Sequence, residues 1–582
     1  MCVQTTRSHR NEKKLTERKE TILIVSGALS EALKSIAEFD PYEDDSDEND
    51  AIIGKMEAPY LFLFHHYQKL HDLVEQKSSY KLVLDPMIQF LEQNYADEYR
   101  QANELFERGF VTAYHSAKLY KPFEVMVVRG NENKTLRAGV LRLLPYRLPG
   151  DKKKWSLDGW SWSYNGREAQ RKIWTHETDA FQTEEVPINE LHIHPLKYAK
   201  PEEIKRLEET GTRFWSMRSQ GLHCYTGWDS KHDRYYSNDR FMVDVRTYHV
   251  IFMSNLHGDD KDEAAYDKLP ENIDATEDMP PDCELFLPDV IQGFHLGSKK
   301  WVVLNVNGFL PRVDWNKNAF RQLVLDDKTQ EMIHALVDVQ KSRDKAMDDI
   351  IKGKGNGLIL LLHGSHGTGK TLTAESVAEI AEKPLYRVTC GDIGTDAQDV
   401  EKYLQTVMYL GKIWDCVLLL DELDVFLEER TMADLARNSL VSVFLRILEY
   451  HDGLLILTSN RVRTFDEAFK SRIQVAIHYD NLSKKSRKAI WRNFFDMLEE
   501  SGEDTNMPEL ERRLNELAEE EMNGRQIRNA LLTARQLAQH RKERLDWEHL
   551  NQVMKTSAAF NKYLKTVKGH TDDRWAREEG IR

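Results

Sequence analysis

The feature that most constrains the fold of this chain is an apolar run that leads directly into a glycine-rich loop. Residues Leu358–Leu362 precede the loop Gly364–Thr371, which has the sequence GSHGTGKT. The apolar run predicts a strand buried on both faces, as in a parallel sheet, and Leu372–Glu382 predicts a helix after the loop. A strand, a G-x-x-x-x-G-K-S/T loop and a helix in this order are typical of a phosphate-binding P-loop.

The chemistry of this loop predicts ATP and Mg²⁺ as cofactors. Glycine lets backbone N–H groups turn inward around a phosphate because it has no Cβ atom to clash. Lys370 can reach the β- and γ-phosphates, and the Thr371 hydroxyl can hold Mg²⁺. The positive N-terminus of the following helix faces the same anion. The loop residues expected to bind the nucleotide are Gly364, Ser365, His366, Gly367, Thr368, Gly369, Lys370, Thr371 and Leu372.

A second apolar strand ends in two carboxylates. Val417–Leu420 is followed directly by Asp421 and Glu422. Ligands of open parallel sheets bind outside the carboxyl ends of the strands, so we expect these acids beside the phosphate loop. Asp421 is predicted to hold Mg²⁺, and Glu422 to orient and polarise the attacking water. In isolation such a pair also fits a solvated acidic turn, but the phosphate loop disfavours that interpretation.

Two further candidates follow the third predicted strand, Leu454–Leu457. The amide of Asn460 could fix the water against the γ-phosphate. Arg472 stands just before a short strand, and an arginine donated across a subunit boundary neutralises charge in the transition state of phosphoryl transfer. By itself, Arg472 would be interpreted as a surface salt-bridge residue. Since no other arginine is an evident candidate to act within its own chain, we expect a neighbouring copy to supply Arg472.

The loop, the acidic strand, the asparagine and the late arginine occur in an order and spacing that resemble the AAA+ ATPases. The surrounding sequence is similar to fungal AAA-type ATPases that have a large uncharacterised N-terminal region. The resemblance covers about 330–570 and, more weakly, about 120–330. It implies a Walker A motif at Gly364–Thr371, a Walker B motif at Leu418–Glu422, sensor 1 at Asn460 and an arginine finger at Arg472.

The same resemblance implies a helical lid that follows the α/β core and folds over the nucleotide. Arg525, at the start of a helix with apolar periodicity, would contact the γ-phosphate from this lid. Arg528 lies three residues further on and shares roughly the same face, but a solvated helix surface is the simpler interpretation of that residue. Asp349 and Ile350 lie where related ATPases contact adenine.

The chain departs from the family pattern at two places. Ser365 and His366 replace the proline-containing pair usual in such loops, a change that phosphate binding by backbone N–H groups tolerates. Rings that thread a protein carry an aromatic-hydrophobic-glycine loop after the second core strand. Here the strand Leu385–Thr389 is followed by Ile393 and Gly394 with no aromatic residue before them, so the sequence does not predict threading.

Composition limits the function classes. The 582-residue chain has a net charge of −15, which argues against a default binder of nucleic acid or anionic membrane. No apolar stretch approaches the roughly 18 residues that span a bilayer. The five cysteines have no paired spacing, which suits a reducing compartment. We therefore expect a cytoplasmic or nuclear protein without a membrane span.

The predicted fold is an α/β P-loop NTPase core of the AAA+ type, with a parallel sheet and a C-terminal helical lid, preceded by a β-rich α+β N-terminal domain. A chain of this length suggests about three domains. The expected segments are a disordered acidic tail (1–55), a helical segment (56–114), a β-rich domain (115–315) with a mobile acidic loop (258–284), the ATPase core (316–481), the lid (482–570) and a tail (571–582).

Two patterns in the β-rich domain have ordinary structural interpretations. Trp160 and Trp162 are two residues apart and so lie on one face of a strand, where packing in a core is the common role of such aromatics. His192 and His194 have the spacing of half a metal site, but no further ligand stands at a suitable spacing. Thr371 and Asp421 are therefore the predicted metal ligands.

The leading functional hypothesis is a Mg²⁺-ATP hydrolase that assembles into a ring or partial ring. Turnover would remodel a protein client, or a complex, that the N-terminal domain recognises. The alternative is a nucleotide-dependent scaffold or assembly switch with little turnover, which the absent pore-loop aromatic favours. A nucleic-acid-remodelling ATPase is a third hypothesis, and the acidic net charge counts against it.

Overall fold

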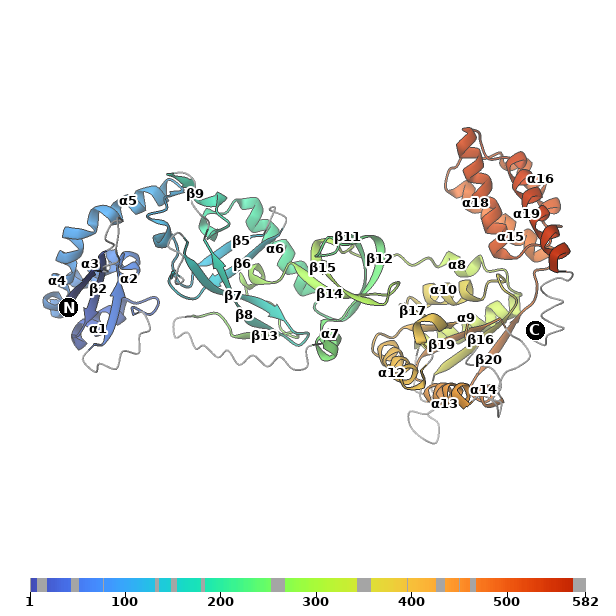
Figure 1. Cartoon of the computed structure of the whole chain (residues 1–582), viewed down its shortest axis with the longest axis horizontal. Helices are drawn as coiled ribbons and strands as arrows, with labels where there is room; N and C mark the ends of the chain where they lie inside the picture. Colours follow the sequence, from blue (N-terminus) through green and yellow to red (C-terminus); the bar gives the residue numbers. More distant parts are fainter. Residues whose placement is uncertain are drawn as a thin grey trace.

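The computed structural model describes residues 2–7, 18–42, 52–76, 78–130, 135–147, 154–178, 184–252, 267–342, 357–394, 396–424, 435–449, 451–460 and 467–568. Figure 1 shows a row of units: a small N-terminal unit (blue), two antiparallel sheets (teal and green), a parallel-sheet domain (yellow to orange) and a helical domain beside it (red). Within these ranges, no helix combines the length and apolar character required to cross a membrane.

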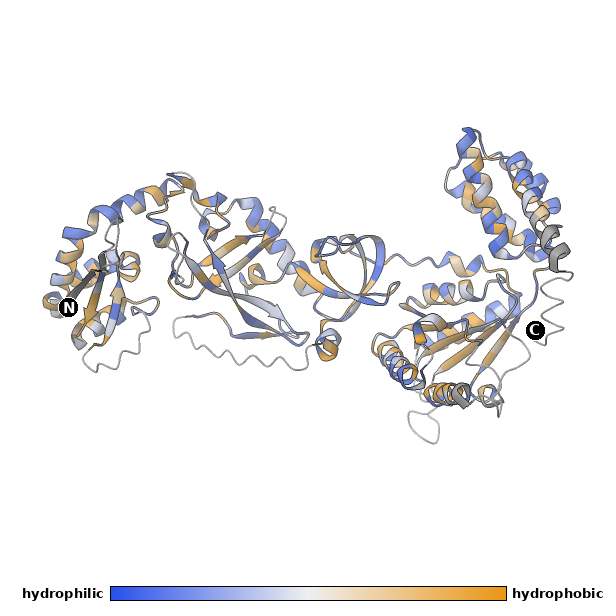
Figure 2. Ribbon diagram, in the orientation of Figure 1, coloured by the Kyte–Doolittle hydropathy of each residue, from blue (hydrophilic) through white to orange (hydrophobic). Residues whose placement is uncertain are grey.

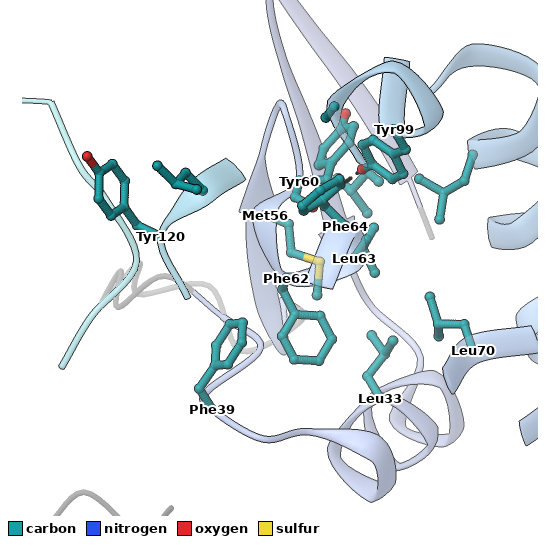
Figure 3. Close-up of a cluster of buried hydrophobic side chains, with 14 of the residues drawn as sticks. Leu33, Phe39, Met56, Tyr60, Phe62, Leu63, Phe64, Leu70, Tyr99 and Tyr120 are labelled. Atoms are coloured by element: carbon teal, nitrogen blue, oxygen red, sulfur yellow. Dashed lines mark hydrogen bonds between the residues drawn. The ribbon is translucent and has the colours of Figure 1, made fainter. Parts of the chain in front are cut away.

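The N-terminal unit packs helices on a three-stranded antiparallel sheet in the order β1-β2-β3. Its elements are β1 (Cys2–Arg7), β2 (Arg18–Ile24), α1 (Gly27–Ile36), β3 (Gly54–Glu57), α2 (Leu61–His65), α3 (Tyr67–Gln76), α4 (Ser78–Asn94) and α5 (Ala96–Glu107). In its core, Phe62 of α2 meets Phe39 edge-on with ring centroids 5.5 Å apart, and Leu33 of α1 is fully buried (Figure 3).

The prediction of a disordered tail over residues 1–55 is wrong for the described part of that segment. Ile22 and Ile24 of β2 have no exposed surface, and α1 buries Leu29. These side chains belong to one apolar cluster with residues of α2 to α5. Composition hid this core because the acidic block dominates the segment, whereas the apolar partners come from later in the chain. Residues 43–51, which hold most of that block, lie outside the described residues.

Two antiparallel sheets follow, one of six strands in the order β10-β5-β6-β7-β8-β13 and one of four strands in the order β11-β12-β14-β15. Their elements are β5 (Val125–Arg129), β6 (Leu136–Leu141), β7 (Ser156–Tyr164), β8 (Glu168–Glu177), β10 (Ile193–Pro195), α6 (Pro201–Ser216), β11 (Gly221–Trp228), β12 (Tyr235–Val243), α7 (Val245–Phe252), β13 (Asn272–Asp274), β14 (Val290–His295) and β15 (Lys300–Asn305). The short elements are β4 (Phe110–Val111), η1 (Ser116–Leu119), β9 (Val186–Pro187), η3 (Ile188–Glu190), η4 (Leu196–Tyr198), η5 (Cys283–Phe286) and η6 (Val306–Gly308). Trp160 and Trp162 of β7 are both buried, as their spacing predicts.

The prediction of a mobile acidic loop over residues 258–284 is wrong from residue 267 onward, and the residues before it lie outside the described part. Here β13 adds to the edge of the six-stranded sheet by pairing with β8. Asp267 accepts a hydrogen bond from the Trp160 indole N–H at 3.1 Å and lies 2.7 Å from the Arg171 guanidinium. The acid thus has fixed partners, which composition alone does not reveal.

The C-terminal half confirms the predicted α/β core with a parallel sheet and a helical lid. Its five described strands lie in the order β17-β18-β19-β16-β20. The core elements are α8 (Asn318–Arg321), α9 (Asp327–Ser342), β16 (Leu358–Gly364), α10 (Lys370–Ala381), β17 (Leu385–Thr389), α11 (Cys390–Ile393), α12 (Ala397–Ile413), β18 (Val417–Asp421), α13 (Leu435–Glu449), β19 (Leu454–Ser459), α14 (Glu467–Lys470) and β20 (Val475–Tyr479). The lid consists of α15 (Lys484–Glu500), α16 (Met507–Arg512), α17 (Leu514–Leu517), α18 (Gly524–Arg541) and α19 (Trp547–Lys568). The core strands are largely apolar (Figure 2), as expected for a sheet covered on both faces.

The four-stranded sheet packs directly against the parallel-sheet domain. Phe294 of β14 stacks on Tyr386 of β17 with ring centroids 5.7 Å apart, and the Trp414 ring after α12 lies 5.0 Å from Phe294. Arg240 of β12 forms an ion pair of 2.7 Å with Glu379 of α10. The sheet is therefore held against the helix that begins at the phosphate loop.

Candidate nucleotide-binding site

Three strands bring the phosphate loop, the two acids and Asn460 to one edge of the parallel sheet. β16, β18 and β19 run parallel, and Leu457 of β19 pairs with Leu361 on one side and Leu420 on the other. Their carboxyl ends therefore meet at the same edge, where ligands of such sheets bind. A cleft of about 690 Å³ opens there, between these strand ends, the segment around α8 and the lid.

The loop that follows β16 depends on glycine for its shape. Gly364 has φ +141°, and a Cβ atom at this position would lie 2.2 Å from the carbonyl oxygen of Tyr479. The Lys370 ammonium group donates to the carbonyl oxygens of Gly364 at 2.9 Å and Ser365 at 2.7 Å. The loop therefore wraps around the ammonium group of Lys370, at the N-terminus of α10.

The carboxylate of Asp421 is the most constrained acid of the site. It is 1% exposed and accepts hydrogen bonds from the hydroxyl groups of Thr371, at 3.1 Å, and Thr458. The Arg387 guanidinium of β17 lies 2.7 Å from its second oxygen. A hydroxyl and a carboxylate are the hard oxygen ligands that Mg²⁺ prefers, so Thr371 and Asp421 fit the metal that the loop implies.

Glu422 has an unusual backbone conformation. Its φ angle is +58°, in the left-handed region that non-glycine residues seldom occupy. The Glu422 N–H donates to the Thr458 hydroxyl at 2.9 Å, and its carbonyl oxygen accepts from the Cys390 thiol at 2.8 Å. Such strain persists only where the surroundings hold it, and here the end of β19 and the start of α11 do so. The side chain is exposed and lines the cleft.

Asn460 lines the cleft, and the carboxylate of Asp424 fixes its backbone. The Asn460 backbone N–H donates to one carboxylate oxygen of Asp424 at 2.8 Å, and the hydroxyl of Ser459 donates to the same oxygen at 2.7 Å. The side-chain amide lies 3.5 Å from the second oxygen. The strand end is thereby fixed, with the asparagine facing the cleft shared by Lys370 and Glu422.

Arg472 is not among the residues that line its own cleft. Its guanidinium donates to the Ala468 carbonyl oxygen at 2.8 Å and lies 3.5 Å from Glu449. Three other arginines do line the cleft, Arg387 from the core and Arg525 and Arg528 from the lid. The chain therefore has arginines of its own at the cleft, and Arg387 among them was not selected from the sequence.

The lid closes one side of the cleft by direct contact with the loop. The Gly524 N–H donates to the Gly367 carbonyl oxygen at 2.9 Å. A Cβ atom at Gly367 would lie 2.7 Å from the side chain of Asn523, the residue that caps α18. Arg525 and Arg528 follow in the first turns of that helix, so the lid presents two guanidinium groups where sequence reasoning favoured one.

The apolar end of the cleft comes from residues that the sequence analysis did not select. Asp349 and Ile350, the expected adenine contacts, lie outside the described residues. The lining here comes instead from the segment between α8 and α9 and from the lid helix α15. Its apolar members are Leu323, Val324, Leu325, Ile490, Phe494 and Met497. The run Leu323–Leu325 between polar neighbours is the signal that could have identified this wall.

Sequence reasoning also missed polar members of the site. Arg387 stands in the middle of a largely apolar strand, and Thr458 directly follows the predicted strand Leu454–Leu457, so both left a readable signal. Glu375 of α10 also lines the cleft, and burial, followed by the charge of Asp421, raises the pKa of its carboxyl group. The sequence does not single out Glu375, because one glutamate within a helix is a common occurrence.

His363, just before the loop, is held neutral. Its ring lies beside that of His478, with centroids 4.9 Å apart. Burial lowers the pKa of His363 to about 4, and the charges of His478 and Lys370 act in the same direction. The position before the loop therefore adds no positive charge to the site at neutral pH.

Comparisons with known proteins identify the same region. Residues 360–481 match the family described as ATPase family associated with various cellular activities (AAA), and residues 482–571 match the fungal AAA+ ATPase lid domain. Residues 101–200 match a domain of unknown function.

Curated relatives match over part of their length. ATPase family AAA domain-containing protein 3B of Homo sapiens is 30% identical over 168 residues, which are 26% of this chain and 25% of that protein. The ATPase family AAA domain-containing protein 3A homolog of Drosophila melanogaster is 25% identical over 191 residues, which are 31% of this chain and 30% of that protein. The mitochondrial Lon protease homolog of Yarrowia lipolytica is 23% identical over 250 residues, 37% of this chain and 21% of that protein. The matched segments thus span less than a third of each relative.

Proposed function

The chain carries an AAA ATPase domain followed by a fungal AAA+ ATPase lid domain, which supports ATP binding and hydrolysis, and from this premise we propose that the cleft binds Mg²⁺-ATP and hydrolyses its terminal phosphate. The observation that carries the proposal is the shared cleft: Lys370, Thr371, Asp421, Glu422 and Asn460 come from three separate segments and all line it.

The roles follow from the chemistry of each group. Lys370 binds the β- and γ-phosphates, and Thr371 and Asp421 hold Mg²⁺, which when bound neutralises phosphate charge. Glu422 orients the attacking water and accepts its proton, and Asn460 positions that water.

The periphery of the cleft supplies binding and charge. Ser365, His366 and Thr368 contribute backbone N–H groups of the loop, and Leu372 continues into α10. Arg525 contacts the γ-phosphate from the lid. Arg472 acts on the site of a neighbouring copy, because proteins with AAA domains commonly oligomerise and this side chain does not line its own cleft.

We further propose that turnover remodels a protein client recognised by the N-terminal domain. Support comes from the junction between the two parts: Arg240 of the four-stranded sheet pairs with Glu379, on the helix that begins with Lys370. A change in that helix on nucleotide binding would therefore reach the sheet.

A nucleotide-dependent assembly switch with little turnover is the second candidate, and one contact favours it. Lys299, in the turn between β14 and β15 of the four-stranded sheet, pairs with Asp392 in α11, the segment where threading rings carry their pore loop. A segment held in this way, and without an aromatic residue, is poorly suited to grip a moving substrate. The net charge of −15 continues to disfavour a nucleic-acid substrate.

The proposal is tested by two substitutions with opposite signatures. Glu422→Gln should keep ATP binding and lose at least about a hundredfold in turnover, because general-base catalysis is worth 10²–10⁴. Lys370→Ala should lose ATP binding. Steady-state phosphate release and nucleotide titration measure the two effects, and Arg446→Gln on the outer face of α13 is the control. Normal turnover in Glu422→Gln would contradict these roles.

The same proteins separate the remodeller from the switch. Native mass measurement of Glu422→Gln with and without ATP reports assembly directly. Turnover of the wild-type chain that rises with a bound protein client supports the remodeller, whereas ATP-dependent assembly with turnover slower than one ATP per hour, on the order of an unassisted switch, supports the alternative.

A further inference from the structure

The side chain of Arg387 lies on the face of the edge strand β17 that is turned toward α10 and the cleft. Side chains alternate along a strand, and Tyr386 and Val388 are buried in the cluster that joins this domain to the four-stranded sheet. Leu385 packs instead with the cluster that contains residues of α10. Arg387 shares the face of Leu385, so its side chain lies on the α10 side and lines the cleft.

The ion pair that Arg387 forms uses only part of the hydrogen-bonding capacity of its guanidinium group. It lies 2.7 Å from Asp421, which is its one ion-pair partner in the part of the chain that the structure describes. Its side chain is 47% exposed, and arginine has five N–H donors. Asp421 in turn already accepts hydrogen bonds from two hydroxyl groups. The carboxylate therefore anchors the arginine at the cleft wall and leaves most of its donors for a ligand.

The position of this guanidinium suits a phosphate better than a protein partner. Lys370 and Thr371, which define the phosphate end of the cleft, are joined to Arg387 through Asp421, since the Thr371 hydroxyl lies 3.1 Å from that carboxylate. A planar guanidinium matches the geometry of phosphate oxygens and keeps its charge at any relevant pH. A purely structural counter-ion to a buried acid would not need to be half exposed in the same cleft.

We propose that Arg387 recognises the terminal phosphate of ATP within its own chain and so distinguishes ATP from ADP. The inference rests on the proposed function, since it requires a nucleotide in this cleft. It assigns the ATP-specific contact to the core strand β17, in addition to the lid arginine, and makes triphosphate recognition independent of a neighbouring copy.

The test compares ATP and ADP affinities of the full-length chain for wild type, Arg387→Gln and Arg387→Lys. Titration calorimetry is done with Mg²⁺ and again with EDTA. Loss of a charge-assisted hydrogen bond should weaken ATP binding by roughly tenfold or more in Arg387→Gln, with ADP binding changed less than twofold. Arg387→Lys should recover part of the ATP affinity because it keeps the charge.

Arg446→Gln is the matched control, since Arg446 also pairs with a carboxylate, Glu401, but lies outside the cleft. Unchanged ADP affinity shows that each variant is folded. Equal weakening of ATP and ADP, or no weakening, would overturn the inference and leave Arg387 as a counter-ion to Asp421. An ATP-specific loss confined to Mg²⁺ would also overturn it, since the arginine would then act through the metal ligand. Absence of nucleotide binding in the wild type would instead contradict the proposed function.

Discussion

At the scale of single residues, the site is defined by side chains that fix backbone as much as by those that face a ligand. Glu422 adopts φ +58° between the Thr458 hydroxyl and the Cys390 thiol. Neither partner is needed to bind a phosphate. Both are needed to keep the catalytic candidate in a conformation that costs of order 1–3 kcal/mol.

The Cys390 thiol gives a prediction at this scale. Burial, followed by the charges of Asp424 and Glu422, raises its pKa to about 11. At pH 8 the thiol is therefore protonated, whereas alkylation requires the thiolate. We expect iodoacetamide to modify Cys390 about a hundredfold more slowly than a free cysteine, with a rate that rises about tenfold per pH unit up to pH 10. Peptide mass mapping measures this rate.

An unfolded peptide with the sequence around Cys390 is the control for the alkylation experiment. Cys390 is only partly buried, so protonation, rather than access, should set its rate. A rate in the folded protein equal to that of the peptide at pH 8 would contradict the raised pKa and the hydrogen bond to Glu422.

At the scale of elements, the helix α10 links the phosphate loop to the four-stranded sheet. It begins at Lys370. Near its other end, the Glu379 carboxylate accepts two hydrogen bonds from the guanidinium group of Arg240, at 2.7 and 3.1 Å. The Asn316 backbone N–H donates to the same carboxylate at 2.9 Å. A bidentate, partly buried pair of this kind is stronger than an ordinary surface pair.

A double-mutant cycle on Arg240→Ala and Glu379→Ala should therefore show a coupling free energy of about 1–2 kcal/mol. The measurement is the midpoint of denaturant unfolding, followed by tryptophan fluorescence. The control cycle is Arg446→Ala with Glu401→Ala, where the arginine is 57% exposed and coupling should be under about 0.5 kcal/mol. Equal coupling in both cycles would show that the junction does not depend on this pair.

At the scale of the whole molecule, the domain that holds the candidate nucleotide site is joined to the N-terminal region through an apolar junction. Phe294, Trp414 and Tyr386 form that junction, and all three belong to one buried cluster with the strands of the parallel sheet. Figure 1 shows the lid above the core and the antiparallel sheets to the left of it. Nucleotide-driven lid movement and movement of the N-terminal region would thus occur at opposite ends of α10.

The assembly expected of this molecule makes a prediction at the same scale. If Arg472 serves a neighbouring copy, Arg472→Ala and Lys370→Ala should each lose turnover, and a mixture of the two should recover part of it. Recovery is expected because a mixed interface can pair an intact loop with an intact arginine. The measurement is phosphate release at fixed total protein as the ratio is varied. A mixture no more active than the sum of its parts would argue against a shared site.

The sequence by itself was enough to locate the candidate nucleotide site, because its signals are local. The loop Gly364–Thr371, the acids after Val417–Leu420 and Asn460 each follow an apolar strand, and parallel strands bring their carboxyl ends to one edge. The fold class of the C-terminal half followed from the same pattern. The predictions of a disordered tail and a mobile loop failed for residues 18–42 and 267–284. In these segments, contacts with distant parts of the chain, rather than local composition, decide whether the backbone is ordered.

Only the tertiary structure decided which cations share the cleft and how the N-terminal region meets the core. Arg387, Arg525 and Arg528 line one cleft although Arg387 and Arg525 are 138 positions apart in the sequence, and Arg472 does not join them. Those outcomes depend on strand order and on lid packing, which bring residues together without leaving a periodic trace in the chain. A short motif encodes its own geometry, whereas a contact between distant elements exists only once both have folded.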